Sequence, residues 1–473
     1  MDMRIILVLT LLTTLGCTQH NPDSCCTTMD QCQQLGLSGV VACETGKACT
    51  PAGNCIAAEC NTSPDCTSTA APICEDQLCV ATCSSDAECV GVQAGPYCSA
   101  GACVACVMSS QCTPETPVCD STSLACRGCA QDSECDSGVC LEDIGTCADP
   151  SRLIFVTQFM TDAGECTSSS PCGTLGYALT KMTTARDVIH INSASLPPAP
   201  VALDNHTGRI DGSNTLLTRA DAGNVLSMAA GQMTLTGLRI GNSIGTIVPL
   251  SVSAGHVVAY GVDFLGIVKT SGGTVEIRAS NLEHGVTCDT AGQLILDRSI
   301  VQFTVMTNNC EVEIARSRFE DGSNISTIAS SVHIANNLIL SSSPFTDPVS
   351  LGAVTGSYFM FNTMVNTGPL NTASALQCDA TVDARDNIVA WNSSNAPACA
   401  SQYSLFDSSS VTPAGQGNKS GDVATFFVDL PNGDLHLPSS SPARAAGIAT
   451  SITTDYDGLP RANPPDIGAY QVH

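Results

Sequence analysis

Cysteine recurs at a fixed interval in the first third of the chain. Successive units begin at intervals of 23 residues, and every unit contains four cysteines. The units are Cys60, Cys66, Cys74 and Cys79; Cys83, Cys89, Cys98 and Cys103; Cys106, Cys112, Cys119 and Cys126; and Cys129, Cys135, Cys140 and Cys147. So regular a period is typical of small supersecondary units repeated along a chain. Units of this size bury little apolar area, so we expect disulfides to supply their stability.

The distribution of cysteine divides the chain into two regions. Residues 18–150 hold 22 of the 29 cysteines, whereas residues 151–473 hold only 6. We therefore predict a disulfide-rich stalk at 25–150 and a conventionally packed domain at 151–473. The spacing leaves the disulfide connectivity of the stalk open.

Zinc is the competing interpretation of the cysteine units. Cys103 and Cys106, and likewise Cys126 and Cys129, have the C-x-x-C spacing of zinc ligands. However, both pairs belong to the longer repeat, and His20 is the one histidine between residues 18 and 150. Structural disulfides are therefore expected, and no metal or other cofactor is predicted.

The N-terminus has the form of an export signal. Arg4 precedes the apolar run Ile5–Leu15, which is too short to span a bilayer as a helix, and Gly16-Cys17 follows directly. Leu15-Gly16-Cys17 resembles a bacterial lipobox, which implies a signal peptide at 1–16, lipidation of Cys17 and an anchor and linker at 17–24. Removing Cys17 also leaves an even number of cysteines. We expect an exported chain held by its lipid at the outer membrane or cell surface.

A second repeat runs through residues 151–473. It consists of an apolar residue, two variable positions, Ser or Asn, one variable position and a closing apolar residue. Examples are Ile277-x-x-Ser280-x-Leu282, Leu296-x-x-Ser299-x-Val301, Ile314-x-x-Ser317-x-Phe319, Ile334-x-x-Asn337-x-Ile339, Phe359-x-x-Asn362-x-Met364 and Ala384-x-x-Asn387-x-Val389. With the earlier copies that end at Ile240 and Phe264, the closing positions are 18 to 25 residues apart.

Short apolar segments at this interval favour a chain that winds one coil per repeat. Each strand then stacks on its predecessor, and the apolar positions point into the coil. The prediction is an all-β fold, a parallel β-helix, with further coils near Val188–Ile191 and Gly208–Gly212. A β-propeller is disfavoured because its blades require about 40 residues each. A β-sandwich is disfavoured because its strands would not repeat one sequence pattern in register through eight copies.

The same register predicts two kinds of internal contact. Stacked Asn337, Asn362 and Asn387 are expected to form a hydrogen-bonded ladder from coil to coil. The six cysteines fall into local pairs, of which the last two are separated by about one coil, so we expect disulfides that join adjacent coils. The pairs are Cys166 with Cys172, Cys288 with Cys310, and Cys378 with Cys399.

Two segments of this region resemble a known superfamily. Pro171–Leu175 with Ala185–Ile191 resembles the first coils of bacterial right-handed β-helix proteins of the pectin-lyase-like superfamily. Thr454–Arg461 followed by Pro465–Tyr470, which reads PDIGAY, is similar to their C-terminal cap. The resemblance implies the fold and a cell-surface location, but it implies little about activity, because the superfamily includes lyases, hydrolases, binding proteins and adhesins.

Function is less constrained than fold. A net charge of −26 disfavours nucleic acid as a partner. The register aligns Arg239, Asp263 and Asn281, with Arg318 two coils further, as a candidate surface strip; solvated strand faces carry such residues without a function. We expect adhesion or binding of a glycan or surface protein. The alternative is a tethered polysaccharide lyase or glycoside hydrolase, although no catalytic signature is present and no catalytic residue is predicted.

Overall fold

The computed structural model describes residues 47–49, 55–57, 66, 73–75, 78–80, 82–193, 195–196, 200–242, 244–320, 322–342, 348–368, 374–391, 397–409 and 411–472. Two compact units are present, Met1–Ala130 and Gln131–His473. Cys17 and the predicted signal peptide and linker at 1–24 lie outside the described residues. In the part of the chain that is described, no helix has the length and apolar character needed to cross a membrane.

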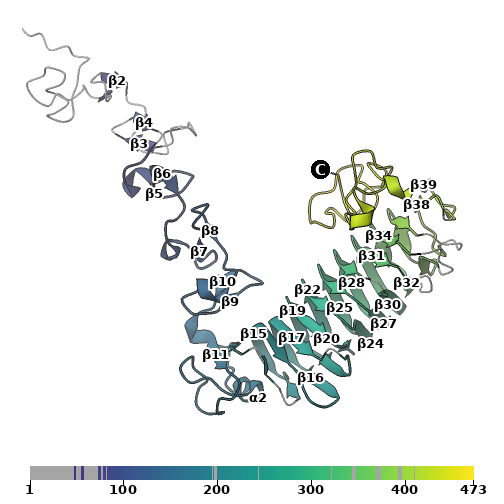
Figure 1. Ribbon diagram of the computed structural model, residues 1–473, viewed down its shortest axis with the longest axis horizontal. Coiled ribbons are helices and arrows are strands. Elements are labelled where there is room, and N and C mark those ends of the chain that lie inside the picture. The colour runs from purple at the N-terminus through teal and green to yellow at the C-terminus, as the bar shows by residue number, and fades with distance from the viewer. Residues whose placement is uncertain are drawn as a thin grey trace, which may run out of the picture. The chain divides into compact units, whose positions relative to one another are not determined.

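Each cysteine unit contains a short antiparallel hairpin (Figure 1). The hairpin strands are β3 (Ile73–Glu75) with β4 (Leu78–Val80), β5 (Tyr97–Ser99) with β6 (Ala102–Val104), β7 (Val118–Cys119) with β8 (Cys126–Arg127), and β9 (Cys140–Leu141) with β10 (Thr146–Cys147). Before them, β1 (Lys47–Cys49) pairs with β2 (Cys55–Ala57). Single 3₁₀ turns precede three of the hairpins, namely η2 (Asp86–Cys89), η3 (Ser109–Gln111) and η4 (Asp132–Glu134).

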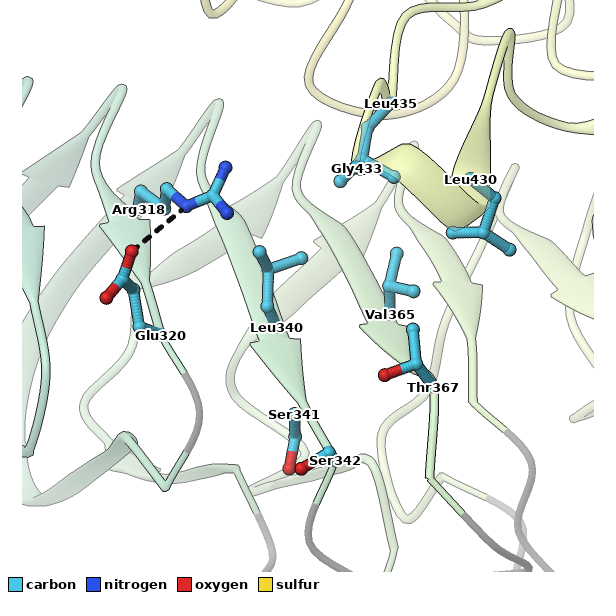
Figure 2. Close-up of a pocket in the computed structure, with 10 residues that line it drawn as sticks. All are labelled: Arg318, Glu320, Leu340, Ser341, Ser342, Val365, Thr367, Leu430, Gly433 and Leu435. Atoms are coloured by element: carbon cyan, nitrogen blue, oxygen red, sulfur yellow. Dashed lines mark ion pairs between the residues drawn. The ribbon is translucent and has the colours of Figure 1, made fainter.

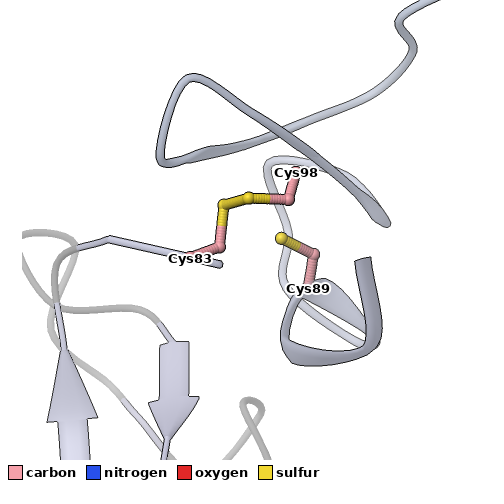
Figure 3. Close-up of side chains that lie close together, drawn as sticks. All are labelled: Cys83, Cys89 and Cys98. Carbon is pink, nitrogen blue, oxygen red and sulfur yellow. A yellow bond between two sulfur atoms is a disulfide. The ribbon is translucent and has the colours of Figure 1, made fainter. Parts of the chain in front are cut away.

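The disulfides follow one pattern in the units that begin at Cys83 and Cys106. The first cysteine bonds the third and the second bonds the fourth, as Cys83–Cys98, Cys89–Cys103, Cys106–Cys119 and Cys112–Cys126. Cys66–Cys79 and Cys135–Cys147 repeat the second of these bonds. Figure 3 shows Cys89 beside the Cys83–Cys98 bond. Because Cys103 and Cys106 bond other partners, these sulfurs are not free to bind zinc.

Repeated polar residues support each unit. The residue before the second cysteine accepts backbone N–H groups from the start of the unit, as Glu88 does from Ser84 at 2.7 Å and Gln111 from Val107 at 2.6 Å. The third residue after the first cysteine accepts the N–H of the third cysteine, as Asp86 does from Cys98 at 2.7 Å. These contacts satisfy backbone donors that so small a fold cannot pair in a sheet.

The second unit is a parallel β-solenoid of stacked coils, which confirms the predicted all-β fold (Figure 1). Its strands form three columns. Column 1 consists of β11 (Leu153–Val156), β12 (Val188–Ile191), β15 (His206–Leu217), β17 (Gly231–Gly241), β19 (His256–Tyr260), β22 (Thr274–Arg278), β25 (Gln293–Asp297), β28 (Glu311–Ala315), β30 (Asn324–Ala335), β33 (Tyr358–Met360) and β36 (Asp383–Arg385). A short helix, α2 (Leu175–Leu179), lies between β11 and β12 in the chain.

Columns 2 and 3 hold shorter strands. Column 2 begins with β13 (Ser195–Leu196) and includes the ends of β15 and β17. It continues through β20 (Asp263–Leu265), β23 (Asn281–Leu282), β26 (Ile300–Val301), β29 (Arg318–Phe319), β31 (Leu338–Ser341), β34 (Thr363–Asn366), β37 (Ile388–Ala390), β38 (Leu405–Asp407) and β39 (Lys419–Gly421). Column 3 holds β14 (Val201–Ala202), β16 (Gly223–Met228), β18 (Ile247–Val252), β21 (Val268–Thr270), β24 (Val286–Asp289), β27 (Thr304–Asn308), the start of β30, β32 (Val349–Ala353) and β35 (Leu376–Cys378).

The closing apolar residues of the sequence repeat stack in register along column 2. Leu282 pairs with Val301, which pairs with Phe319, and all three are fully buried. The stack as a whole runs through Ile240, Phe264, Leu282, Val301, Phe319, Ile339, Met364 and Val389. Its burial provides the hydrophobic stabilisation of the coils.

The bend between columns 1 and 2 carries the polar ladder. Asn337 Nδ2 donates to Asn362 Oδ1 at 3.0 Å, and Asn362 Nδ2 donates to Asn387 Oδ1 at 3.2 Å. The ladder extends through serines, because the N–H of Ser317 donates to Asn337 Oδ1 and that of Asn387 to Ser404 Oγ. These side chains are 0–1% exposed. The ladder therefore satisfies backbone groups that a sharp bend leaves without a sheet partner.

Left-handed backbone accompanies this ladder. The residue before each ladder position has a positive φ, for example 48° at Arg316, 58° at Asn336, 54° at Phe361 and 59° at Asp386. Positive φ is uncommon for residues other than glycine and is unfavourable for bulky ones. The ladder hydrogen bonds and coil stacking together hold this conformation in every rung.

The six cysteines of residues 151–473 lie in the pairs that their spacing indicated. Bonds join Cys166 to Cys172, Cys288 to Cys310 and Cys378 to Cys399. β24, which contains Cys288, pairs with β27 of the next coil, just before Cys310. The last two bonds therefore link adjacent coils, and the first closes a loop beside β11.

From Gln131 onward, the last cysteine unit belongs to the same compact unit as the solenoid. Its apolar residues Val139, Leu141 and Ala148 pack against Leu153 of β11 and Val188 of β12. Arg209 of β15 also donates to both carboxylate oxygens of Asp143, at 2.5 and 2.7 Å. This cysteine unit thus covers the apolar side chains at the first coil.

The C-terminal segment, which contains η6 (Val423–Thr425) and η7 (Leu430–Asn432), folds back onto column 2 (Figure 1). Ile467 and Ala469 join a core cluster with Ile388 and Leu405, which point outward from column 2. Gly468 has a φ of +94°, and a Cβ there would lie 2.6 Å from Ile388 Cδ1. Glycine is therefore required where the returning backbone meets the coils.

Candidate functional site

The outer face of column 2 changes character along the solenoid. The outward position before each closing residue carries Arg239, Asp263, Asn281, Ile300 and Arg318 on successive coils. On the next coils the same position carries Leu338, Thr363, Ile388 and Leu405, which are 0–2% exposed because the C-terminal segment covers them. The face is therefore open and mostly polar up to Arg318 and covered beyond it.

The predicted surface strip does not form one continuous site. Arg239 Nε lies 3.7 Å from Asp263 Oδ2, so these two side chains pair with each other. Ile300, which is 39% exposed, separates Asn281 from Arg318. Arg318 instead has Glu320 of its own coil as a partner, with Nε 3.5 Å from Oε1. The structure thus separates Arg318 from the other three strip residues.

Arg318 and Glu320 stand at the rim of a pocket of about 340 Å³ where the open face meets the C-terminal segment. Leu340 of β31 and Val365 of β34 form its apolar floor, and Leu430 and Leu435 contribute from the C-terminal segment (Figure 2). Figure 2 also shows Ser341, Ser342 and Thr367 on the side away from Arg318. The pocket combines an ion pair, an apolar surface and hydroxyl groups.

Local hydrogen bonds set the position of the wall supplied by the C-terminal segment. Asp429 accepts the N–H of Asn432 and caps η7, and Gly433 takes a left-handed φ of 79° that ends it. The chain then reverses, with the N–H of Val428 donating to the His436 carbonyl at 2.8 Å. This turn directs Leu430 and Leu435 toward the coils.

A small polar cluster lies on the same segment. His436 Nδ1 is 2.6 Å from Asp434 Oδ1, and Nε2 is 3.1 Å from Asp457 Oδ2. Burial alone lowers the pKa of His436, but the two aspartates outweigh it and raise the pKa above its usual value. The His436 ring also contacts Tyr470, with centroids 4.1 Å apart.

Arg461 holds the C-terminal segment against the coils. Its guanidinium donates to Asn336 Oδ1 at 2.7 Å and to the carbonyls of Gly468 and Ala469 at 2.9 and 3.0 Å. It also lies 4.1 Å above the Phe361 ring. Burial lowers the pKa of Arg461 to about 10. The sequence gives no signal for the role of Arg461, which ties the last residues of the C-terminal segment to the coils at Asn336 and Phe361.

The aspartates of this segment have structural partners. Asp466 accepts the N–H groups of Ala445 and Val472 at 2.6 and 2.7 Å. Asp455 accepts those of Leu459 and Gln471 at 2.9 and 3.1 Å. These carboxylates therefore hold loops together rather than facing the pocket.

The pocket is suited to binding. Among its lining residues Glu320 is the one carboxylate, whereas hydrolysis of a glycosidic bond ordinarily requires two. An arginine beside a carboxylate stays protonated and is a poor general base. Both groups form bidentate hydrogen bonds readily, and the leucine and valine floor offers an apolar contact.

Known proteins resemble the chain in structure rather than in sequence. No family model and no curated protein matches the chain. A solved structure titled "Crystal structure of pectate lyase Pel9A" matches with 11% sequence identity and a TM-score of 0.44, over 69% of this chain and 97% of its own. At that level the likeness bears on neither activity nor ligand.

Proposed function

We propose that this chain is an exported surface lipoprotein whose β-helix binds a glycan in the pocket beside Arg318. The observation that carries the proposal is the combination found there: the Arg318–Glu320 pair next to a floor of Leu340 and Val365. Sugars present hydroxyl groups at their edges and C–H groups on their faces. The charged pair suits the hydroxyls, and the floor suits the C–H face.

Charge indicates which glycans to examine first. The chain carries a net charge of −26, so a highly anionic polymer is repelled over most of the surface. At the pocket the Arg318 guanidinium is balanced by Glu320 rather than in excess. A neutral polysaccharide is therefore the favoured ligand class, with acidic ones as the comparison.

The test is retention of the purified full chain on immobilised neutral and acidic polysaccharides. Arg318→Ala is expected to weaken binding at least about tenfold, since it removes a charge-assisted contact. Arg239→Ala is the matched control, because it occupies the same strand position on an earlier coil, outside the pocket. Binding by Arg239→Ala should equal that of the unaltered chain.

The same incubations separate binding from catalysis. New reducing ends or unsaturated products would show that the chain is a polysaccharide hydrolase or lyase and would replace the binding proposal. Failure of every polysaccharide to be retained, or equal retention of Arg318→Ala, would contradict it.

Surface attachment is the second part of the proposal and depends on Cys17. The disulfide-rich units fit an oxidising, extracytoplasmic compartment. Cys17→Ser should release the chain from the membrane fraction of its bacterial host and abolish incorporation of a labelled fatty acid. If the variant stays membrane-bound with the label, the lipid is attached elsewhere.

A further inference from the structure

A polar cluster lies where the last cysteine unit meets the first coils of the solenoid. His190 of β12 and Asp211 of β15 occupy paired positions on adjacent coils, and each is 5% exposed. His190 Nδ1 is 2.9 Å from Asp211 Oδ2. Neither residue can be identified as part of a site from the sequence, because nothing in the repeat shows that this outward position is covered.

The cysteine unit adds a third group. Asp132 of η4 accepts a hydrogen bond from the hydroxyl of Ser213, next to the bend after Asp211, at 2.5 Å. One atom that can bind a metal from each of Asp132, His190 and Asp211 lies within 4.8 Å of the others. Among the described residues, the other groups with such spacing are cysteines already joined in disulfides.

Negative charge at this junction exceeds positive charge. Glu142 and Asp143 lie on the same cysteine unit, and Arg209 is already engaged by Asp143 through two hydrogen bonds. Burial raises the pKa of Glu142, and Asp211, Asp132 and Asp143 raise it further. Asp132 and Asp211 also accept hydrogen bonds from the Cys140 N–H and from the Ser213 and Thr236 hydroxyls. These donors are neutral and do not balance the carboxylate charge, and a partly buried set of carboxylates favours a bound cation.

We infer that Asp132, His190 and Asp211 form a binding site for a divalent transition-metal ion of the zinc class. Zinc accepts imidazole nitrogen and carboxylate oxygen as ligands, whereas calcium takes oxygen ligands almost alone. Ligand atoms around tetrahedral zinc lie about 3.4 Å apart. Small side-chain rotations would therefore bring the three groups onto one ion.

The consequence is a cross-link between parts of the chain that the disulfides do not join. Asp132 belongs to the cysteine unit, whereas His190 and Asp211 belong to successive coils. The ion would hold the cysteine unit on the end of the solenoid, adding to the apolar contacts of Val139 and Leu141. This site is independent of the pocket at Arg318, so each can fail without the other.

The experiment uses the purified, fully oxidised full chain without an affinity tag. After treatment with a chelator it is titrated with Zn²⁺ in a calorimeter, and bound metal is measured by elemental analysis. We expect one equivalent of zinc at this site, a higher midpoint of thermal unfolding with zinc than without, and weaker binding of Ca²⁺.

Two pairs of variants locate the ion. His190→Gln and Asp132→Asn should each weaken zinc binding at least about tenfold, as loss of a ligand requires. The matched controls are His256→Gln, which removes a histidine paired with Glu276 on neighbouring coils, and Asp86→Asn, which removes the aspartate at the same repeat position in another cysteine unit. Both controls should bind zinc as the unaltered chain does.

Three outcomes would overturn the inference. These are no zinc binding by the unaltered chain, equal binding by His190→Gln and Asp132→Asn, or calcium bound more tightly than zinc. If His190→Gln does not fold, Asp132→Asn decides, since Asp132 is only partly buried. That variant should fold, because asparagine keeps an oxygen that can accept the Cys140 N–H, and it should lose the rise in unfolding temperature caused by zinc.

Discussion

The two regions of this molecule are stabilised by different means. In the cysteine units, the hairpin strands are only two or three residues long, and disulfides between cysteines 12 to 15 residues apart hold them in place. In the solenoid, a continuous apolar core runs through the coils, and three disulfides are added to it. Covalent bonds thus replace a core where the chain per unit is too short to build one.

Reduction should separate the two regions most clearly. Closing a loop of about 15 residues is worth roughly 3 kcal/mol, so losing two bonds removes most of the stability of a cysteine unit. After complete reduction we expect proteolysis throughout residues 83–129, whereas residues 151–472 stay resistant. Mass spectrometry of the fragments measures this. Protection of the cysteine units after thiol counting has shown full reduction would contradict it.

The polar ladder allows the reverse experiment in the solenoid. Asn362→Ala removes the acceptor of the buried Asn337 backbone N–H, together with the side-chain hydrogen bonds from Asn337 to Asn362, from Asn362 to Asn387 and from Asn362 to the Ile334 carbonyl. Each buried unsatisfied group costs about 1–3 kcal/mol, so a loss of at least roughly 3 kcal/mol in unfolding free energy is expected. Chemical denaturation measures it, with Ser326→Ala, a half-exposed outward residue, as the control. Equal effects of the two substitutions would mean that the ladder contributes little.

Buried charge in the solenoid should appear as a pH dependence. Burial raises the pKa of Asp386 from 3.8 to about 7. The folded chain therefore binds a proton more readily than the unfolded chain, and this residue's contribution to stability falls as pH rises from about 4 to 7. Asp386→Asn should stabilise the chain at pH 8.5 by up to roughly 4 kcal/mol and have little effect near pH 4. Thermal unfolding at the two pH values tests this, and an equal effect at both would show that Asp386 does not titrate as stated.

The outer surface should tolerate change best. Arg239 and Asp263 form an exposed pair at 3.7 Å. Such pairs contribute about 0–1 kcal/mol, so Arg239→Ala should change the unfolding free energy by less than about 0.5 kcal/mol. Denaturant titration of this variant measures that change, which we expect to be the smallest of the effects compared. A larger loss would mean that the outer faces, and not only the core and ladder, hold the coils together.

Register was predictable because one repeated phrase carried two signals. The closing apolar residues, such as Leu282, Val301 and Phe319, fixed which side chains point inward. The polar position between them fixed the bend, where Asn337, Asn362 and Asn387 hydrogen-bond from coil to coil. The cysteine pairs followed from the same spacing, since a separation of one coil brings two residues to neighbouring rungs.

The pocket was not predictable, because its walls come from distant parts of the chain. Arg318 was identified from register, but Leu430 and Leu435 reach it only through the returning C-terminal segment. One signal was present in the sequence: the outward position changes from Arg318 to Leu338, Ile388 and Leu405, and exposed strands rarely carry such residues. The packing of Val139 and Leu141 on the first coil had no comparable signal, because earlier cysteine units also contain scattered apolar residues.

The left-handed residue that precedes each ladder position limits which insertions and deletions this fold can accept. Inserting or deleting one amino acid between Arg316 and Phe361 would displace a bend from its hydrogen-bonding partners and reverse the inward and outward sides of a strand. Removing a complete turn of the spiral preserves both. Length in this architecture is therefore expected to change by whole turns, about 4.8 Å at a time, while the segment that closes over column 2 moves with the end of the spiral.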